Sequence, residues 1–364
     1  MTVKTHKLKL LPPKIDYSQL IKEISDANRA LGELKGLLAN IPNPDLLTTP
    51  LLTKEAVASS KIEGTQATIE DVFKYEAEGK STENDSKEQD VREIINYRLA
   101  IREAVELLKK KAIGENFVKK LHSTLLNSVR GENKDRGNFR KIPVFIGKPG
   151  ATIENAIFVP PGATEMVELI SNWEKYINSN DEPDPLVQTA IAHYQFEAIH
   201  PFLDGNGRIG RLLIPIVLYD KETLSYPLLY VSESFENNRE DYYGCLRLVD
   251  DENDWISWIK YFLRSIKTQA EDTQEKVKDM LTLYKETKDK LSVFNSQYGI
   301  ELLDIIFENP AVSFKSIKSE IRTNSYQTIY NLLNKFEKDG ILREITGNKR
   351  NKIYVFDKLM KIIR

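Results

Sequence analysis

The stretch from His200 to Arg211 reads HPFLDGNGRIGR and lies between two runs of apolar residues that recur at helical spacing. The second run begins near Gly207, so this stretch predicts a loop that leads into a helix. The first N–H groups of a helix have no partner inside the helix and lie at the positive end of its dipole. Gly-Asn-Gly at this position therefore predicts a nest of backbone donors for an anion such as phosphate.

The side chains around the nest suit phosphate chemistry. Arg208 and Arg211 are three residues apart on nearly one helix face, where two guanidinium groups would bind further phosphates. Asp204 offers the hard oxygen ligand that Mg²⁺ uses when it bridges phosphates. His200 titrates near neutral pH and is a natural general base. Taken alone, Gly-Asn-Gly is more typical of a plain glycine-rich helix start with surface arginines and a structural histidine.

The whole stretch satisfies H-x-F-x-[D/E]-G-N-G-R-x-x-R, and it resembles the signature of the Fic family of protein adenylyltransferases. The resemblance implies a mainly α fold with a Fic-type helical core, and transfer of AMP from ATP, with Mg²⁺, to Ser, Thr or Tyr hydroxyls of proteins. It makes His200 the catalytic base and Asp204 the metal ligand, and it adds the Asn206 side chain at the α-phosphate. The residues implied to bind ATP are Glu63, His200, Gly205, Asn206, Gly207, Arg208, Gly210, Arg211 and Tyr243.

A second motif precedes the core. Residues 59–64, Ser-Ser-Lys-Ile-Glu-Gly, match the family's inhibitory pattern [S/T]-x-x-x-E-[G/N]. By itself this spacing is ordinary for a helix with a glycine cap. Beside the signature it implies an inhibitory helix at about 53–64, with Ser59, Glu63 and Gly64 as its motif and Glu63 paired with Arg211.

Two further segments resemble parts of the family. Residues 137–161 hold two β-prone runs, 140–146 and 153–159, and resemble the flap hairpin on which a target segment docks by main-chain pairing. Arg239 and the pair Tyr242-Tyr243 resemble the segment that closes over the nucleotide base. Packing of both tyrosines in the core is an equally good interpretation.

The order of periodic segments predicts four regions. Residues 1–90 form an N-terminal helical region, 91–266 the catalytic core, 267–293 a helical linker and 294–364 three helices followed by a hairpin. That last order resembles a winged helix-turn-helix. Within the first region, Glu78–Asp90 contains almost nothing apolar and predicts a solvated loop.

Composition limits the possible partners. The chain has 52 Lys+Arg and 54 Asp+Glu, so nucleic acid would need a local basic patch. Residues 294–364 carry a net charge of +4, from 12 basic and 8 acidic residues, and DNA is a possible partner there. The residues expected at DNA are Ser325, Gln327, Thr328, Asn331 and Lys335 on the third helix, and Lys349, Arg350 and Lys352 in the turn.

No apolar run is long enough for a membrane span or a signal peptide, so we expect a cytoplasmic protein with no membrane partner. The single Cys245 excludes an intrachain disulfide and is expected to be packed. His193 lies seven residues before His200, a spacing that suggests a pair of metal ligands, but a structural histidine is the better interpretation. His122 is expected in the core.

Three other functions stay open. The same site could use a different nucleotide donor, or it could remove AMP with Glu63 orienting a water molecule. The chain could also be a DNA-binding regulator that only senses ATP. A homodimer is possible, and the sequence does not identify the target protein.

Overall fold

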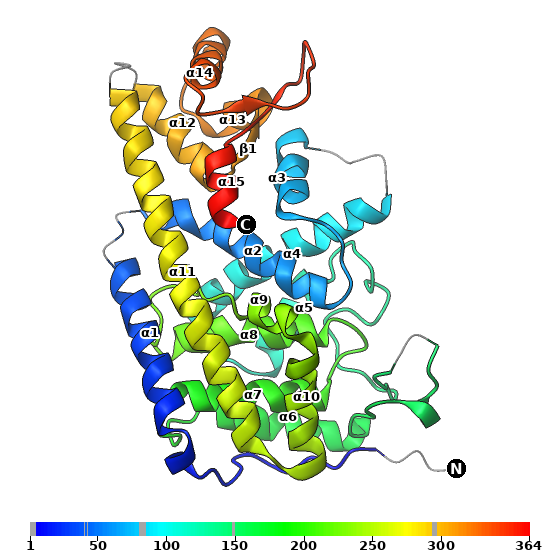
Figure 1. Ribbon diagram of the computed structural model, residues 1–364. Helices are drawn as coiled ribbons and strands as arrows, with labels where there is room; N and C mark the ends of the chain where they lie inside the picture. Colours follow the sequence, from blue (N-terminus) through cyan, green and yellow to red (C-terminus); the bar gives the residue numbers. More distant parts are fainter. Residues whose placement is uncertain (1–4, 40, 42, 80–84, 148–149, 293–296) are drawn as a thin grey trace. The chain divides into compact units, whose positions relative to one another are not determined.

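The computed structural model describes residues 5–39, 41, 43–79, 85–147, 150–292 and 297–364. Part of the expected solvated loop (80–84), the tip of the expected flap (148–149) and the junction between the expected linker and the C-terminal region (293–296) lie outside the described residues. The described chain is mainly helical with one small sheet, which confirms the expected fold class (Figure 1).

The chain divides into two compact units that are each built from two separate stretches. The motif unit comprises Met1–Gly36 and Leu99–Ala270, and the C-terminal unit comprises Leu37–Arg98 and Glu271–Arg364. This division cuts across the four consecutive regions expected from the sequence. Residues 37–90 belong with the C-terminal region because their helices pack against it.

The motif unit is an assembly of helices around α7. Its helices are α1 (Ile21–Ala39, shared at its end), α5 (Glu115–Leu125), α6 (Ala163–Ile177), α7 (Pro185–Ile199), α8 (Asn206–Asp220), α9 (Val231–Asn237), α10 (Arg239–Glu252) and the first part of α11 (Trp255–Ser292). Helix α7 packs against both α6 and α8, and almost all its side chains are buried. Two tryptophans fix it further, since Trp173 and Trp258 donate to the carbonyls of Ala192 and Ala190, at 2.9 Å each.

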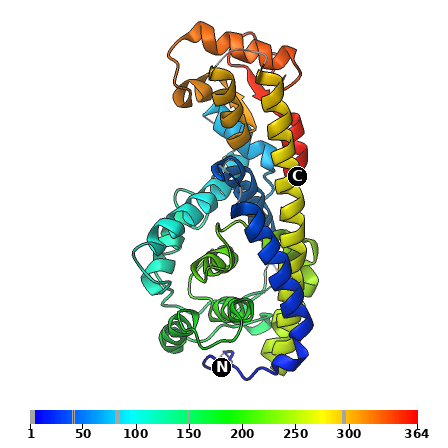
Figure 2. The ribbon, with the colours of Figure 1, turned by 90° about the vertical axis from the view of Figure 1, so that its left-hand side faces the viewer.

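Helix α1 runs beside the first part of α11, as Figure 1 and Figure 2 both show. Arg264 of α11 pairs with Glu23 of α1 at 2.8 Å. The expected linker is the continuation of the same 38-residue helix rather than a separate element. Its apolar residues repeat at helical spacing throughout, with Val277 and Met280 fully buried.

The C-terminal unit combines early and late parts of the chain. Its early elements are α2 (Asp45–Ile62), α3 (Ile69–Glu78) and the part of α4 (Asp85–Leu108) that ends at Arg98. Its late elements are α12 (Gln297–Glu308), β1 (Ala311–Ser313), α13 (Phe314–Glu320), α14 (Tyr326–Lys338), β2 (Arg343–Glu344), β3 (Ile353–Val355) and α15 (Asp357–Ile363). We call residues 297–364 the C-terminal module.

The module has the element order of a winged helix-turn-helix. Its three strands are antiparallel in the order β1-β3-β2, and Val355 of β3 lies opposite Ala311 on one side and Arg343 on the other. Strand β1 and helix α15 are additions to the three helices and hairpin expected from the sequence. Short strands of two or three residues give too little alternation for a sequence pattern to predict.

Two helix starts differ from the expectations. Helix α2 begins at Asp45, well before the expected start near residue 53, and it includes Pro50. Burial of Leu46, Leu47 and Leu51 offsets the hydrogen bond that the proline cannot donate. Helix α4 begins at Asp85, inside the stretch expected to be a solvated loop. No helix among the described residues is both long and apolar enough to cross a membrane.

Candidate active site

The candidate site is the loop between α7 and α8. His200 ends α7 in the left-handed region, with φ 51° and ψ 61°, and its N–H still donates to the Phe196 carbonyl at 3.1 Å. Gly205 precedes α8 with φ 75°, a conformation that glycine adopts without strain. The chain therefore turns twice within six residues, and the first N–H groups of α8 come to the loop, as the anion nest requires.

Asn206 holds this loop closed through its side chain. Its Oδ1 accepts from the Phe202 N–H at 2.8 Å, and its Nδ2 donates to the Phe202 carbonyl at 2.9 Å. The side chain is buried, and both of its polar atoms are used. The sequence did not indicate this loop-closing contact, and the role of the Asn206 amide at an α-phosphate stays a prediction. The Asn206 backbone N–H is among the first N–H groups of α8.

Arg140 fixes the loop from the other side. Its Nε donates to the His200 carbonyl at 2.8 Å, and its Nη2 donates to the carbonyls of Pro161 and Ile199 at 2.6 and 3.2 Å. Its own N–H donates to the Pro201 carbonyl at 2.9 Å. Burial lowers the pKa of this guanidinium, yet Arg stays charged because its ordinary pKa is so high. Arg140 thus joins both ends of residues 140–161 to the backbone that carries His200.

His122 of α5 supports the second half of the loop. Its ring stacks on Phe202 with 3.7 Å between centroids, its Nδ1 accepts from the Gly137 N–H at 2.9 Å, and its Nε2 lies 3.0 Å from the Asp204 carbonyl. Because Nδ1 accepts, the proton sits on Nε2 and donates to Asp204. Burial lowers the pKa of His122 to about 4, so the ring is neutral at pH 7. The expected core position is confirmed, with a polar role that the sequence did not indicate.

The charged side chains expected in the site lie on the first turns of α8 and just before it. Arg208 and Arg211 are both buried. Arg208 Nη2 lies 3.4 Å from Asp204 Oδ1, and the Asp204 side chain is 40% exposed. Gly131, with φ 88°, faces that carboxylate so closely that a Cβ there would lie 2.7 Å from Oδ2. Among the residues that the structure describes, no cluster of three or more His, Cys, Asp or Glu side chains could hold a metal.

His193 is a structural residue. Its Nδ1 donates to the Gly210 carbonyl at 3.0 Å, so its Nε2 accepts from the Tyr242 hydroxyl at 2.9 Å. Full burial lowers its pKa to about 3. Gly210 itself allows the close approach of α7, because a Cβ there would lie 2.1 Å from Glu197 Oε1. Gly210, which occupies an unspecified position of the signature, thus serves helix packing here.

The two neighbouring tyrosines have different environments. Tyr242 is buried and stacks on Phe235 at 4.4 Å. Tyr243 is 38% exposed, with the Arg239 guanidinium 5.9 Å from its ring centroid. Tyr242 is therefore a core residue, and Tyr243 keeps a face on which a nucleotide base can stack.

Among the described residues of the expected flap, the two runs are joined by one antiparallel bridge. Ile146 donates to the Phe158 carbonyl at 2.8 Å, and its own carbonyl accepts from Ile157 at 2.8 Å. Neither side extends into a regular strand, and residues 153–155 form a 3₁₀ turn. The apolar side chains here are exposed, at 58% for Ile142, 40% for Phe145 and 53% for Ile157. Such a segment presents both apolar surface and main-chain groups to a partner.

In the C-terminal unit, residues 59–64, which the sequence predicts to be inhibitory and which we call the inhibitory segment, end helix α2. Glu63 is the C-cap and is exposed, and Gly64 follows with φ 96°. Thr65 donates to the Ser60 carbonyl at 3.2 Å and Gly64 donates to the Lys61 carbonyl at 2.9 Å, which is the Schellman pattern. The Glu-Gly pair is thus explained by the helix end. A carboxylate at this negative end of the dipole is stabilised by a cationic partner.

Sequence reasoning missed Arg140 and the polar role of His122. Arg140 bonds the backbone of His200, 60 positions away, and His122 bonds the backbone of Asp204, 82 positions away. No local spacing marks such contacts. The one available signal was the charged pair Arg140-Lys141 at the start of an extended run that is apolar from Ile142 to Ile146.

The comparisons with known proteins agree with this geometry. A helical assembly with a phosphate nest and the complete signature defines a Fic-type domain. The family model described as Fic/DOC family N-terminal matches residues 21–106, and that described as Fic/DOC family matches residues 112–218. Together they span just over half of the chain. The chain belongs to the Fic/DOC family.

Similar proteins support the assignment. Protein adenylyltransferase Fic from Drosophila ananassae is 30% identical over 184 residues, which is 50% of this chain and 33% of that protein. The match to the Drosophila grimshawi protein is of the same extent, so the chain spans about a third of the length of these curated relatives.

Solved structures show the same fold. A Fic family protein from Desulfovibrio desulfuricans aligns over 95% of this chain and 98% of its own, with a TM-score of 0.60 at 21% identity. Fic-1 (residues 134–508) from C. elegans aligns over 72% of this chain and 75% of its own, with a TM-score of 0.55 at 19% identity.

The two buried histidines predict how stability depends on pH. The unfolded chain binds a proton at each ring below pH 6.5, whereas folded His122 stays neutral down to about pH 4. The free energy of unfolding should therefore fall as pH drops from 6.5 towards 4, by about 2–3 kcal/mol for His122 alone. Urea unfolding at pH 7 and pH 4.5 measures this. The His122→Gln variant should show a shallower decline, and equal declines would contradict the prediction.

Proposed function

We propose that the chain is a protein adenylyltransferase that transfers AMP from ATP to hydroxyl groups of a target protein and of itself. The observation that carries the proposal is the α7–α8 loop. The loop turns at His200 and again at Gly205, and this brings together the His200 imidazole, the backbone N–H groups of the nest and two buried arginines of α8. The names of the Drosophila relatives support AMP as the group transferred.

In this mechanism a target hydroxyl attacks the α-phosphorus of ATP, and the bond to the bridging oxygen of pyrophosphate breaks. His200 accepts the hydroxyl proton as the new bond forms. The backbone N–H groups of residues 205–207 hold the phosphates, while Arg208 and Arg211 stabilise the charge that develops on pyrophosphate. Positioning and electrostatics supply most of the rate in such transfers. Arg140 contributes by fixing the main chain on both sides of His200.

The donor set suits Mg²⁺ that is held mostly by the substrate. Asp204 supplies one partly exposed carboxylate. Mg²⁺ commonly binds through one or two carboxylates plus substrate phosphates and water, so a dedicated cage is not needed. When bound, Mg²⁺ would neutralise phosphate charge. Tyr243 and Arg239 are proposed at the nucleotide base.

The target segment is proposed to dock on the flap. The exposed Ile142, Phe145 and Ile157 offer apolar contacts, and the short bridge at Ile146 leaves neighbouring backbone groups for pairing. Main-chain pairing selects an extended segment with little dependence on its sequence.

Replacing the base should separate chemistry from binding. We expect His200→Ala to lower AMP transfer by about 10²–10⁴-fold, because a general base contributes that much. ATP affinity should stay close to wild type, since the nest and arginines are unchanged. Mass spectrometry of the protein after incubation with ATP counts the added AMP, and parallel incubations with other nucleotides and with modified protein test other donors and AMP removal. Transfer within threefold of wild type would remove His200 from this role.

We further propose that Glu63 inhibits the reaction by pairing with Arg211. An arginine engaged by a carboxylate does not hold the γ-phosphate, and the carboxylate also repels that phosphate. ATP would then bind with its phosphates away from the in-line geometry. The position of Glu63 at the negative end of α2 supports the pairing, because a guanidinium there offsets an unfavourable charge.

Removing the carboxylate should activate the enzyme. We expect Glu63→Gly to raise autoadenylylation at saturating ATP by about tenfold or more, since 1.4 kcal/mol of barrier corresponds to tenfold in rate. Ser59→Ala, one turn earlier, should give a smaller gain of the same sign.

The chain offers a matched control. Glu78 is also exposed, also ends a helix of the C-terminal unit, and is also followed by a glycine with positive φ, Gly79 at 71°. Glu78→Gly should leave the rate at the wild-type level. Equal rates in the wild type and Glu63→Gly would mean that the segment does not inhibit.

A second candidate function is binding of duplex DNA by the C-terminal module. Helix α14 presents an exposed polar face, with Gln327 bonded to Asn331 at 2.8 Å and Lys335 one turn further. Lys349 and Arg350 are exposed in the turn between β2 and β3. A helix for the groove and cations for phosphate are the two parts of winged-helix recognition.

Charge reversal tests the DNA proposal on the full chain. Duplex binding should weaken in Lys349→Glu/Arg350→Glu, and the plot of log affinity against log salt should become shallower by about 1–2, because each lost phosphate contact removes about one. Lys110→Glu/Lys111→Glu, an adjacent exposed pair in the motif unit, is the control and should bind like the wild type. If wild-type protein shows no salt-dependent shift of duplex DNA, the module docks on protein instead.

A further inference from the structure

The inhibitory segment belongs to the same compact unit as the C-terminal module, although about 230 residues separate them in sequence. Helix α2, which ends at Glu63, packs against α12 and α15 of the module. Helix α3, which follows the segment, packs against β1, α13 and β3. The packing of this unit therefore fixes the backbone on both sides of Glu63 to the module.

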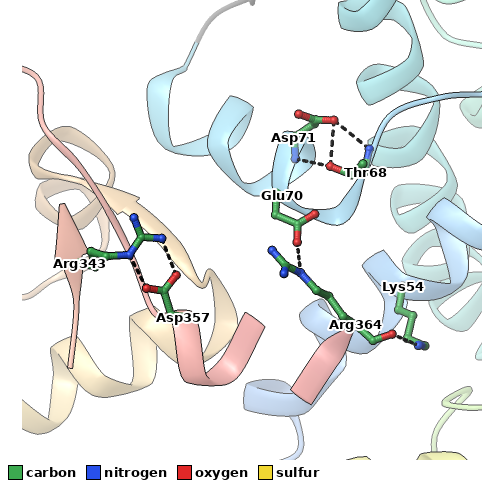
Figure 3. Close-up of polar contacts among 7 residues, drawn as sticks. All are labelled: Lys54, Thr68, Glu70, Asp71, Arg343, Asp357 and Arg364. Carbon is green, nitrogen blue, oxygen red and sulfur yellow. Dashed lines mark hydrogen bonds and ion pairs between the residues drawn. The ribbon is translucent and has the colours of Figure 1, made fainter. Parts of the chain in front are cut away.

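Arg364 fastens the module to both early helices (Figure 3). Lys54 of α2 is a residue only 4% exposed, and its ammonium donates to the main-chain oxygen of Arg364 at 2.7 Å. The Arg364 guanidinium pairs with Glu70 in the first turn of α3. A buried ammonium loses hydration and depends on such partners, so the Lys54 contact is the stronger of the two.

A second fastening lies at the other end of α3. The Ser313 hydroxyl at the end of β1 donates to the Ala77 carbonyl at 2.7 Å, and both residues are buried. Ser313 also caps α13, because its Oγ accepts from the Ser316 N–H at 3.1 Å. One side chain thus links the helix-turn-helix of the module to α3.

The residues directly after Glu63 are held as well. The Gln66 N–H donates to Asp90 Oδ2 at 2.8 Å, and the Thr65 hydroxyl donates to Glu93 Oε2 at 3.2 Å. Both carboxylates belong to α4 and are buried. Glu63 therefore lies between a helix packed on the module and a turn bonded to α4, and its backbone moves only when that packing loosens.

We propose that the C-terminal module holds the inhibitory segment in its inhibiting position, with Lys54, Glu70 and Arg364 as positioning residues. This inference rests on the proposed inhibition by Glu63 and assigns its regulation. Loosening the module from α2 and α3 frees the segment and raises AMP transfer. A ligand of the module that strains these contacts activates the enzyme in the same way.

Two variants of the full chain test the proposal. Arg364→Ala removes the ion pair with Glu70, and Lys54→Met keeps the length of a buried side chain while removing its hydrogen bond. We expect autoadenylylation to rise about two- to fivefold in Arg364→Ala, as befits a partly exposed ion pair, and about fivefold or more in Lys54→Met. Hydrogen exchange of the backbone N–H groups of residues 57–66 should become faster in both.

The control is a second arginine of the module. The Arg343 guanidinium forms a bidentate ion pair with the Asp357 carboxylate, in which Nη2 donates to Oδ1 at 2.8 Å. Both residues belong to the module (Figure 3). Arg343→Ala therefore removes a similar exposed ion pair without touching α2 or α3. Its rate and its exchange in residues 57–66 should match the wild type.

The same changes made in the Glu63→Gly background distinguish the possible failures. If the module acts through Glu63, Arg364→Ala and Lys54→Met add nothing to the gain of Glu63→Gly. A gain in Glu63→Gly with wild-type rates in both positioning variants overturns this inference and leaves the proposed inhibition standing. If Glu63→Gly gains nothing, the proposed inhibition fails, and unchanged exchange in residues 57–66 would overturn the mechanical coupling independently.

Discussion

The guanidinium of Arg140 is the contact on which the candidate site depends. A buried cation must find acceptors, and this one takes the carbonyls of Ile199, His200 and Pro161. These oxygens lie at the end of α7 and at the end of residues 140–161, so one side chain holds the α7–α8 loop to that segment. The left-handed turn at His200 releases its carbonyl from the α7 ladder, which makes it available to Arg140. The left-handed backbone of His200 and the burial of Arg140 thus belong to one arrangement.

The site could be predicted from the sequence where its chemistry is local. The signature fixes a helix start, two arginines one turn apart and a histidine before the nest, and the structure brings these together on one loop and one helix. Prediction failed where a side chain serves distant backbone, as Arg140 and His122 do. The Asn206 amide also closes the loop onto Phe202, a contact that the sequence did not indicate. Nothing in the spacing distinguishes an amide that binds substrate from one that closes a loop.

The fold shows the same division between local and distant causes. Long amphipathic helices were predictable from their periodicity. The mainly helical fold class followed from these helices. The helical state of residues 85–90 was not predictable, because their polar composition is that of a loop. Within the unit, however, Asp90 is buried and accepts from the Gln66 backbone. Polar residues that satisfy other backbone groups resemble solvated ones until the partner is known. Helix α2 is the opposite case, where buried leucines override the signal of Pro50.

The division into two units has a related physical reason. Each unit closes around segments far apart in the chain, and the contacts that close it involve single polar side chains such as Lys54 and Ser313 on main-chain oxygens. Such contacts carry no periodicity, so a linear pattern divides the chain into consecutive regions. The glycine at 64 illustrates the consequence. It is required by the left-handed end of α2 whether or not Glu63 inhibits, so the local motif explains the conformation of the segment, and only the surrounding packing gives that conformation a regulatory meaning.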